Sequence, residues 1–503
     1  MKKSLFARAL DKIEIVGNKL PHPATLFLIM AAIVVLCSGI ASYFNLHTIH
    51  PVTNEVISVN NLLSADGFRW IFTNIEHNFM MFPPLGLVLV IMVGIGVAEG
   101  SGLFTMLVRQ LVLVAPPRFI TPALIIAGIL SHLASEVGYV VLIPLGAMLF
   151  QAIGRHPMAG FAAAFAGVSA GFGSNFLIGS VDPILAGLSS AAANIIDPEM
   201  HVNPMVNYYF MVASAIMIVI VGTFIVERIV EPRLGKYNGD VEALAIDKPT
   251  DKERKGLRWA GYSTLILIAL LALTIIPENG LLRDPETGGI LRSPFFSGII
   301  VSLLLVFLVP GLVYGKIVGT INNDKQMMNA MGKSMSGMGG YIVLVFFAAQ
   351  FVYFFKESNL GMIFAIEGAT WLKEIGFTGF PMIVCFVILV AFINMFMGSA
   401  SAKWAILAPV FVPMLMLLDY HPGLTQAAFR IGDSVTNVIT PMMSYFALLV
   451  VYAEKYDKKS GVGTLISLML PFSVIFMIVW LILLAIWFYC GLPLGLEGPI
   501  HMM

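Results

Sequence analysis

The chain has 503 residues, of which 58% are hydrophobic and only 12% are charged. A soluble globular domain carries about 25% charged residues, so this composition excludes an ordinary soluble protein. Lysine plus arginine and aspartate plus glutamate both total 29, which leaves no basic excess for binding nucleic acid. The three cysteines are far apart and indicate neither a disulfide framework nor a zinc site. Long apolar blocks are typical of an all-α polytopic membrane protein.

The N-terminal segment, residues 1–20, carries five lysine and arginine residues and precedes an apolar block over residues 23–44. That block has roughly the twenty residues that cross a bilayer, so we interpret it as an uncleaved first helix with a cytoplasmic N-terminus. Residues 45–82 contain one arginine and no lysine, which indicates the outer face. From the apolar blocks that follow, we expect nine to eleven membrane crossings. Two amphipathic stretches, 100–116 and 360–378, could cross or lie in the interface.

A charged linker, residues 229–256, separates a first membrane half (21–228) from a second (257–503). Residues 227–258, which include this linker, contain 15 charged residues, eight of them basic. The positive-inside rule therefore predicts that the linker is cytoplasmic. Three lysines just before the last apolar block place its start on the same side and the C-terminus outside.

The two halves resemble each other when one is shifted by 265 residues. Over fewer than thirty gap-free positions there are eight identities, namely Leu142, Pro144, His156, Pro157, Ala162, Ala163, Gly167 and Ser169 with Leu407, Pro409, His421, Pro422, Ala427, Ala428, Gly432 and Ser434. Repeats of this kind, often of inverted topology, are typical of secondary transporters with a site near the bilayer midplane. Inversion is an inference from this pattern, and coincidence among common apolar residues is the alternative.

Each repeat contains apolar segments that are too short or too interrupted to be simple spans. We predict re-entrant hairpins near 131–155 and 397–420, and broken helices over 157–193 and 422–453. Glycine, asparagine and proline at the centre of each broken helix would unwind it and free backbone carbonyls. Unwound backbone at membrane depth occurs where it is buried or lines a cavity. Packing glycines and proline kinks are the alternative explanation.

Charged side chains lie within or beside these repeats, where each costs on the order of 3 kcal/mol. They are Glu136, Asp182, Lys403, Arg430 and Asp433. Carboxylates suit proton or sodium coupling, because protonation or ion binding neutralises them. The alternative for the two aspartates is a structural ion pair with the arginine or the lysine. The histidines of the two His-Pro pairs are interpreted as parts of structural turns rather than as a proton relay.

Neutral polar residues and one aromatic residue complete the candidate site. They are Ser135, Ser174, Asn175, Asn394, Ser399, Ser401, Trp404 and Asn437. Such groups beside a few charges suit a small polar organic anion with an aromatic part. Trp404 could stack on that ring or could be an interface anchor. We expect no cofactor other than a coupling ion, H⁺ or Na⁺, with a possible sodium site near Asn175 and Asn437.

Two other classes of function are considered. Two membrane aspartates, Asp182 and Asp433, suggest an intramembrane protease, and Ser399 with Lys403 suggests a Ser–Lys dyad. The chain has no Gly-x-Gly-Asp, His-Glu-x-x-His or Gly-x-Ser-x-Gly motif, so we expect that it is not an enzyme. A passive channel would also be compatible with broken helices and an internal repeat.

Five stretches resemble one known family over nearly the whole chain. They are Gly17-Asn-Lys-Leu-Pro-His-Pro23, Gly154-Arg-His-Pro-Met-Ala-Gly160, Glu231-Pro-Arg-Leu-Gly235, Asn279-Gly-Leu-Leu-Arg-Asp-Pro285 and Leu407-Ala-Pro-Val-Phe-Val-Pro413. The chain resembles the AbgT family of p-aminobenzoyl-glutamate transporters. The resemblance implies a homodimer in the bacterial inner membrane, with about nine spanning helices and two re-entrant hairpins in each protomer. It also implies a polar cavity and ion-driven import of p-aminobenzoyl-glutamate or, in some members, export of sulfonamide antimetabolites.

The resemblance also implies which residues line the transport pathway. The family positions match here as Asp182, Asn394, Trp404, Pro422, Arg430 and Asp433. An arginine in that region could meet a substrate carboxylate bidentately. Some importing members have aspartate where this chain has Glu136, so the resemblance leaves import and export open. The expected partners are a small organic anion, membrane lipid and a second copy of the chain.

Overall fold

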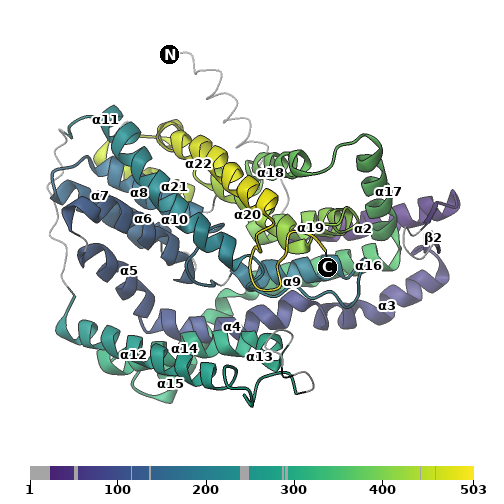
Figure 1. Cartoon of the computed structure of the whole chain (residues 1–503), viewed down its shortest axis with the longest axis horizontal. Coiled ribbons are helices and arrows are strands. Elements are labelled where there is room, and N and C mark those ends of the chain that lie inside the picture. The colour runs from purple at the N-terminus through teal and green to yellow at the C-terminus, as the bar shows by residue number, and fades with distance from the viewer. Residues whose placement is uncertain are drawn as a thin grey trace.

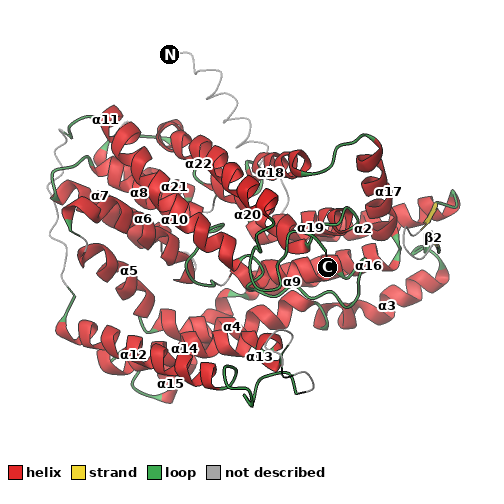
Figure 2. Cartoon of the chain, viewed as in Figure 1, coloured by secondary structure: helices red, strands yellow, loops and turns green. Residues whose placement is uncertain are grey.

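The computed structural model describes residues 23–49, 55–114, 116–134, 138–179, 181–237, 249–285, 288, 293–441, 443, 445–458 and 460–502. Two predicted site residues, Ser135 and Glu136, lie outside the described residues, as do the N-terminal segment up to residue 22 and the middle of the charged linker. Within the described residues helices joined by loops make up the fold, and the named strands are one short antiparallel pair, β1 (His47–Ile49) and β2 (Val56–Ser58) (Figure 2).

The helices follow one another along the chain with few long connections (Figure 1). Those of the first half are α2 (Pro23–Tyr43), α3 (Ala65–Met80), α4 (Pro83–Gly100), α5 (Leu103–Val114), η1 (Pro117–Phe119), α6 (Ile120–Leu130), η2 (Ser131–Ala134), η3 (Gly138–Leu142), α7 (Ile143–Ala152), α8 (Pro157–Ala170), α9 (Val181–Ala193), α10 (Tyr208–Ile225), η4 (Val226–Val230) and α11 (Glu231–Leu234). Those of the second half are α12 (Asp251–Leu273), α13 (Pro294–Ser297), α14 (Ile299–Val318), α15 (Asp324–Gly337), α16 (Gly339–Glu357), α17 (Leu360–Glu374), α18 (Phe380–Asn394), α19 (Ala400–Met416), α20 (Pro422–Asn437), α21 (Phe446–Tyr456) and α22 (Val462–Cys490).

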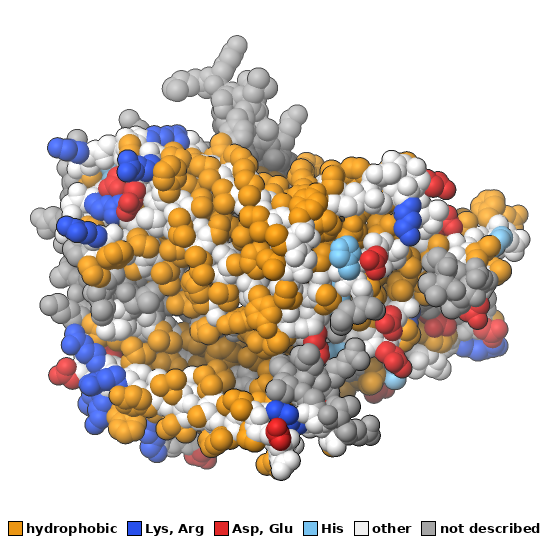
Figure 3. Space-filling view, viewed as in Figure 1, with side chains coloured by type: hydrophobic (Ala, Val, Ile, Leu, Met, Phe, Trp, Pro, Cys, Tyr) orange, Lys and Arg blue, Asp and Glu red, His pale blue; other side chains and the backbone are white. Residues whose placement is uncertain are grey.

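Among the described residues, six helices are long and apolar enough to cross a membrane, and seven shorter ones are apolar. The charged linker predicted over 229–256 is partly helical, because α11 lies within it and α12 begins inside it. Thr250 and Glu253 form a capping box that starts α12 in its charged segment, before the apolar residues begin. Figure 3 shows apolar side chains over the middle of one face, with Lys and Arg gathered at the end near α11 and the start of α12.

The two segments predicted as re-entrant hairpins are each preceded by a short apolar helix. The predicted segment 131–155 contains η2, η3 and the ten-residue α7, and 397–420 contains α19, whereas the helices that precede these segments are α6 and α18. With 11 residues, α6 extends about 16 Å, roughly half of a hydrocarbon core of about 30 Å. An arm of this length suits a re-entrant hairpin.

Both arms of the first hairpin pack on α8. Gly167 of α8 lies against the backbone of Ile125 in α6, and Gly160 of α8 lies against the backbone of Gly146 in α7. All fourteen residues of α8 are buried, as are the first fifteen of α20. The two helices are therefore surrounded by protein rather than lipid, and the hairpins provide part of that surrounding.

The two broken helices start 265 residues apart, since α8 begins at Pro157 and α20 at Pro422. Contacts between them run in reverse order along the chain: Asp182 with Arg430, then Ser189 with Gln426. Correspondingly, α9 packs beside α20 and α21 beside α8 (Figure 1). Segments paired in this crossed way are antiparallel, which is the arrangement that an inverted repeat produces.

The repeated glycines Gly167 and Gly432 lie inside helices and not at the breaks. A Cβ on Gly167 would lie 2.5 Å from the carbonyl oxygen of Ile125, and one on Gly432 would lie 2.5 Å from that of Val387. Each glycine therefore lets a buried helix approach the first arm of its hairpin at backbone distance. Close packing therefore explains the two repeated glycines, which is the alternative explanation given in the sequence analysis.

We expect Gly432→Ala to lower the free energy of unfolding by about 1–3 kcal/mol, because the added methyl group overpacks against α18. Gly332→Ala in α15 is the matched control, since a Cβ there would meet nothing within 4 Å. Thermal unfolding of the purified protein in detergent compares the two variants with the wild type. Equal stability of both variants would contradict the packing role of Gly432.

Candidate functional site

The two helix breaks and the two hairpin tips meet around one cavity of about 330 Å³. Both halves of the chain contribute to its lining, which comprises His132, Tyr139, Phe172, Val181, Ile184, Gly398, Ser399, Ala400, Ser401, Asp433, Asn437, Met443 and Tyr445. A larger cavity of about 660 Å³ lies between α17, α18 and α19, but its lining is almost entirely apolar. Only the smaller cavity combines polar groups with the helix breaks, so we take it as the candidate site.

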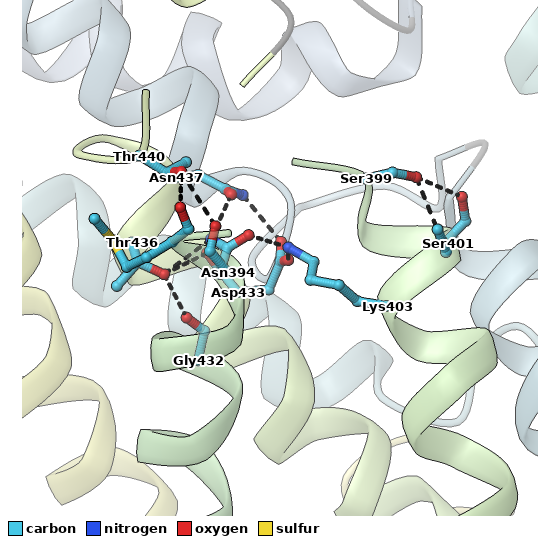
Figure 4. A network of polar contacts seen from close by, with 11 residues as sticks. Asn394, Ser399, Ser401, Lys403, Gly432, Asp433, Thr436, Asn437 and Thr440 are labelled. Carbon is cyan, nitrogen blue, oxygen red and sulfur yellow. Dashed lines mark hydrogen bonds and ion pairs between the residues drawn. The ribbon is translucent and has the colours of Figure 1, made fainter. Parts of the chain in front are cut away.

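An ion pair between Lys403 and Asp433 lies beside this cavity. Lys403 is in the first turns of α19 and Asp433 is near the end of α20, and both side chains are completely buried. The Lys403 ammonium contacts Oδ1 of Asp433 and donates a hydrogen bond to Oδ1 of Asn394 (Figure 4). A buried ion pair of this kind is costly to form and is strongly disrupted when one partner is removed.

Asn394, the last residue of α18, joins this pair to the end of α20. Its Nδ2 lies 2.8 Å from the carbonyl oxygen of Asp433, from Oγ1 of Thr436 and from Oδ1 of Asn437. Asn437 in turn donates to Oδ2 of Asp433 at 2.9 Å. Both carboxylate oxygens of Asp433 therefore have partners, one charged and one neutral. The network lies where α20 ends, next to the second helix break (Figure 4).

A second buried ion pair joins the two halves. Nη2 of Arg430 in α20 lies 2.5 Å from Oδ1 of Asp182 at the start of α9. Nη1 of Arg430 also donates to the carbonyl oxygen of Phe172 at 3.2 Å, and Oδ2 of Asp182 accepts from the amide of Gly179 at 2.6 Å. Arg430 thus contacts the first broken helix on both sides of its break. This geometry supports the structural ion pair that the sequence analysis left as an alternative.

Trp404 lies away from the cavity. Its ring is completely buried against Phe429, with 4.6 Å between centroids, and its Nε1 donates to Oγ of Ser189 at 3.0 Å. The sequence-based interpretation that it could stack on a bound ring does not fit this position, and neither does an interface anchor. Its side chain fills the space between α9 and α20.

Pro422 starts α20 at the end remote from the cavity. It occupies the first turn after His421, whose Nδ1 accepts a hydrogen bond from the amide of Gly423 at 3.1 Å. His156 caps α8 in the same way, through the amide of Met158 at 3.2 Å. The prediction that both histidines form structural turns is confirmed. Eleven residues of helix place Pro422 about 16 Å from Asp433.

The predicted serines and Asn175 have local partners. Ser174 donates to the carbonyl of Ala170 at 2.8 Å, and Oδ1 of Asn175 accepts from the next amide at 2.8 Å. Ser399 is the N-cap of α19 and lies 3.3 Å from Ser401, and both line the cavity. Lys403 turns away from Ser399 toward Asp433, so this arrangement does not form the Ser–Lys dyad (Figure 4).

Four aromatic residues of the cavity were not selected from the sequence: His132, Tyr139, Phe172 and Tyr445. All four fall in or beside the segments predicted as a hairpin tip or a helix break. Aromatic residues are common in apolar segments, so residue type alone did not distinguish them. One signal was available, because Tyr139 is 265 residues before Trp404 and therefore occupies the matching position of the repeat.

The sequence profile of the AbgT transporter family matches residues 8–502. The chain belongs to the AbgT family. The p-aminobenzoyl-glutamate transport protein of Escherichia coli (strain K12) is 39% identical over 483 residues, which cover 96% of this chain and 95% of that protein. Members of the AbgT family are transporters, so the family and the helical fold identify the chain as a membrane transporter.

Two solved AbgT-family structures share the fold. The YdaH transporter of Alcanivorax borkumensis is 44% identical, with a TM-score of 0.90 over 94% of this chain and 100% of that chain. MtrF of Neisseria gonorrhoeae, described as illuminating a class of antimetabolite efflux pumps, is 48% identical, with a TM-score of 0.92 over 97% and 100%. The resemblance to the AbgT family in the sequence analysis is therefore confirmed, together with the all-α polytopic fold.

Proposed function

We propose that this AbgT-family transporter moves p-aminobenzoyl-glutamate or a related aminobenzoate anion by secondary active transport. The observation that carries the proposal is the cavity between the antiparallel repeats, which is lined by a buried and paired carboxylate, Asp433. Its volume of about 330 Å³ lies in the range of roughly 300–1,000 Å³ that small-molecule sites occupy. The 39% identity to the Escherichia coli p-aminobenzoyl-glutamate transport protein supports the substrate class.

Coupling is assigned to Asp433 and Lys403. Protonation of Asp433 would remove the charge that pairs with the Lys403 ammonium, and would free that ammonium to meet a substrate carboxylate. A sodium ion would need oxygen ligands such as those of Asp433 and Asn394. The Lys403 ammonium already contacts these oxygens and so competes with sodium for them. We therefore favour the proton as the coupling ion, with sodium near Asn175 and Asn437 as the alternative.

Uptake of labelled p-aminobenzoyl-glutamate into proteoliposomes tests this proposal. We expect accumulation when a proton gradient is imposed, and its collapse when a protonophore is added. Accumulation driven only by a sodium gradient would contradict proton coupling while retaining secondary transport. If neither gradient drives accumulation, the secondary-transport proposal is wrong. Protein-free liposomes, and proteoliposomes whose outer buffer is exchanged without imposing a gradient, are the controls for leakage.

A second candidate is efflux of sulfonamide antimetabolites, which the 48% identity to MtrF supports. Direction and substrate separate the two candidates. Paired measurements in right-side-out and everted membrane vesicles would follow a labelled sulfonamide and labelled p-aminobenzoyl-glutamate. Sulfonamide accumulation confined to everted vesicles would support efflux, whereas p-aminobenzoyl-glutamate accumulation in right-side-out vesicles would support import.

The proposal includes a location in the bacterial inner membrane, a cytoplasmic N-terminus and a homodimer. The Lys and Arg side chains gathered near α11 and the start of α12 support a cytoplasmic location for that end (Figure 3). The apolar side chains that α12 exposes, among them Trp259, Leu265 and Leu273, suit contact with lipid or with a second copy.

A further inference from the structure

The cavity has a stacked pair of tyrosines that the proposed function does not yet use. The rings of Tyr139 and Tyr445 are parallel within 4°, with 5.5 Å between their centroids. Tyr139 belongs to η3 at the tip of the first hairpin, and Tyr445 immediately precedes α21 beyond the second helix break. Both line the cavity, so the pair joins the two repeats there.

Other aromatic residues lie near the pair. Tyr139 is buried and packs edge-on against Phe165 of α8, with 6.3 Å between centroids, and Phe172 lines the same cavity. Most of the polar lining comes from the second half, through Asp433 and Asn437 and through the serines at the start of α19, and His132 of the first half adds to it. A cavity lined by both aromatic and polar groups suits a ligand that has an aryl ring and a charged part.

The two repeats contribute differently to this lining. The positions of α8 that match Asp433 and Arg430 of α20 are Val168 and Phe165, so α8 lacks the two charges that α20 carries. At the matching aromatic positions it is the residue of the first half that lines the cavity. Trp404 is buried away from the cavity, whereas Tyr139 at the matching position lines it. The carboxylate of the cavity therefore comes from the second half, whereas its aromatic lining comes from both halves.

We propose that Tyr139 and Tyr445 bind the aryl ring of the substrate by stacking, and that they set the preference for aromatic anions. This inference rests on the proposed function and specifies its recognition element. Stacked aromatic pairs contribute enough beyond their buried area to change binding several-fold. Because the two tyrosines come from different halves, the ring would be held between the repeats, while Asp433 and Lys403 remain available to the polar part.

Calorimetric binding to the full-length protein in detergent tests this inference without requiring transport. The probes are p-aminobenzoyl-glutamate, p-aminobenzoate and N-acetyl-glutamate, the last of which lacks the ring. We expect Tyr139→Leu and Tyr445→Leu each to raise the Kd of both aryl probes about tenfold and to leave that of N-acetyl-glutamate unchanged. Tyr139→Phe keeps the ring and should bind like the wild type. Tyr262→Leu, at an exposed tyrosine of α12, is the matched control.

The outcomes separate the two proposals. Aryl binding within twofold of the wild type in both leucine variants would overturn the inference, and so would an equal loss for all three probes, which would indicate a purely structural pair. Wild-type protein that binds p-aminobenzoate but accumulates no p-aminobenzoyl-glutamate in proteoliposomes would contradict the proposed function alone. A wild-type protein that binds none of the probes would contradict both.

Discussion

Asp433→Asn is expected to abolish gradient-driven transport. The substitution keeps the size of the side chain and an oxygen for Asn437, but it removes the only carboxylate that contacts the Lys403 ammonium within the described network. Without a group that can be neutralised and recharged, proton binding can no longer change the state of Lys403. Uptake by proteoliposomes under a proton gradient, with equal amounts of inserted protein, measures the effect.

The same substitution is also expected to destabilise the protein, since an unpaired buried charge costs about 3–5 kcal/mol. Loss of transport must therefore be separated from loss of structure. The double variant Lys403→Met with Asp433→Leu removes both charges and should recover thermal stability, while transport remains absent. Normal transport by Asp433→Asn would remove Asp433 from the coupling site. Transport by the double variant would show that the pair is only structural.

Asp182→Ala is expected to lower the free energy of unfolding by about 3–5 kcal/mol, because it leaves Arg430 buried without its charge partner. The pair also holds the first helix break through Phe172 and Asp182, so transport should fall together with stability. Thermal unfolding in detergent and uptake in proteoliposomes measure the two effects.

Two further variants make this second prediction specific. Arg430→Lys keeps the charge but replaces a planar fork by a point charge, so it should be less destabilising and should weaken apparent substrate affinity. Unchanged affinity would indicate that Arg430 has only a structural role. The exposed pair of Asp66 and Arg69, at 2.6 Å, is the matched control, and its loss should change little because solvent screens it.

Chemical type and spacing in the sequence were enough to select the buried charges. A chain so poor in charge rarely places charged residues in apolar segments without partners, and Asp182, Lys403, Arg430 and Asp433 all form buried ion pairs. The sequence did not determine which of these charged residues pair with each other. Asp182 and Arg430 are 248 residues apart, so only the packing of α9 against α20 could show that they meet.

The sequence alone was insufficient to predict which aromatic residues line the cavity. Trp404 is the most conspicuous aromatic residue near the predicted site, yet it packs against Phe429 outside the cavity. Tyr139 and Tyr445 are ordinary residues of a membrane sequence, and they line the cavity together. Whether a side chain points into a cavity depends on the rotation of its helix against its neighbours, and hydropathy does not contain that information.

The sequence by itself determined that this protein is a polytopic helical membrane protein with two related halves, because apolar length, helix caps and repeated residues are local properties of the chain. It also supplied the resemblance to a transporter family. The tertiary structure alone decided which charges pair and which aromatic residues face the cavity. Those features arise from contacts between segments hundreds of residues apart, and the crossed, antiparallel packing of the two broken helices sets them.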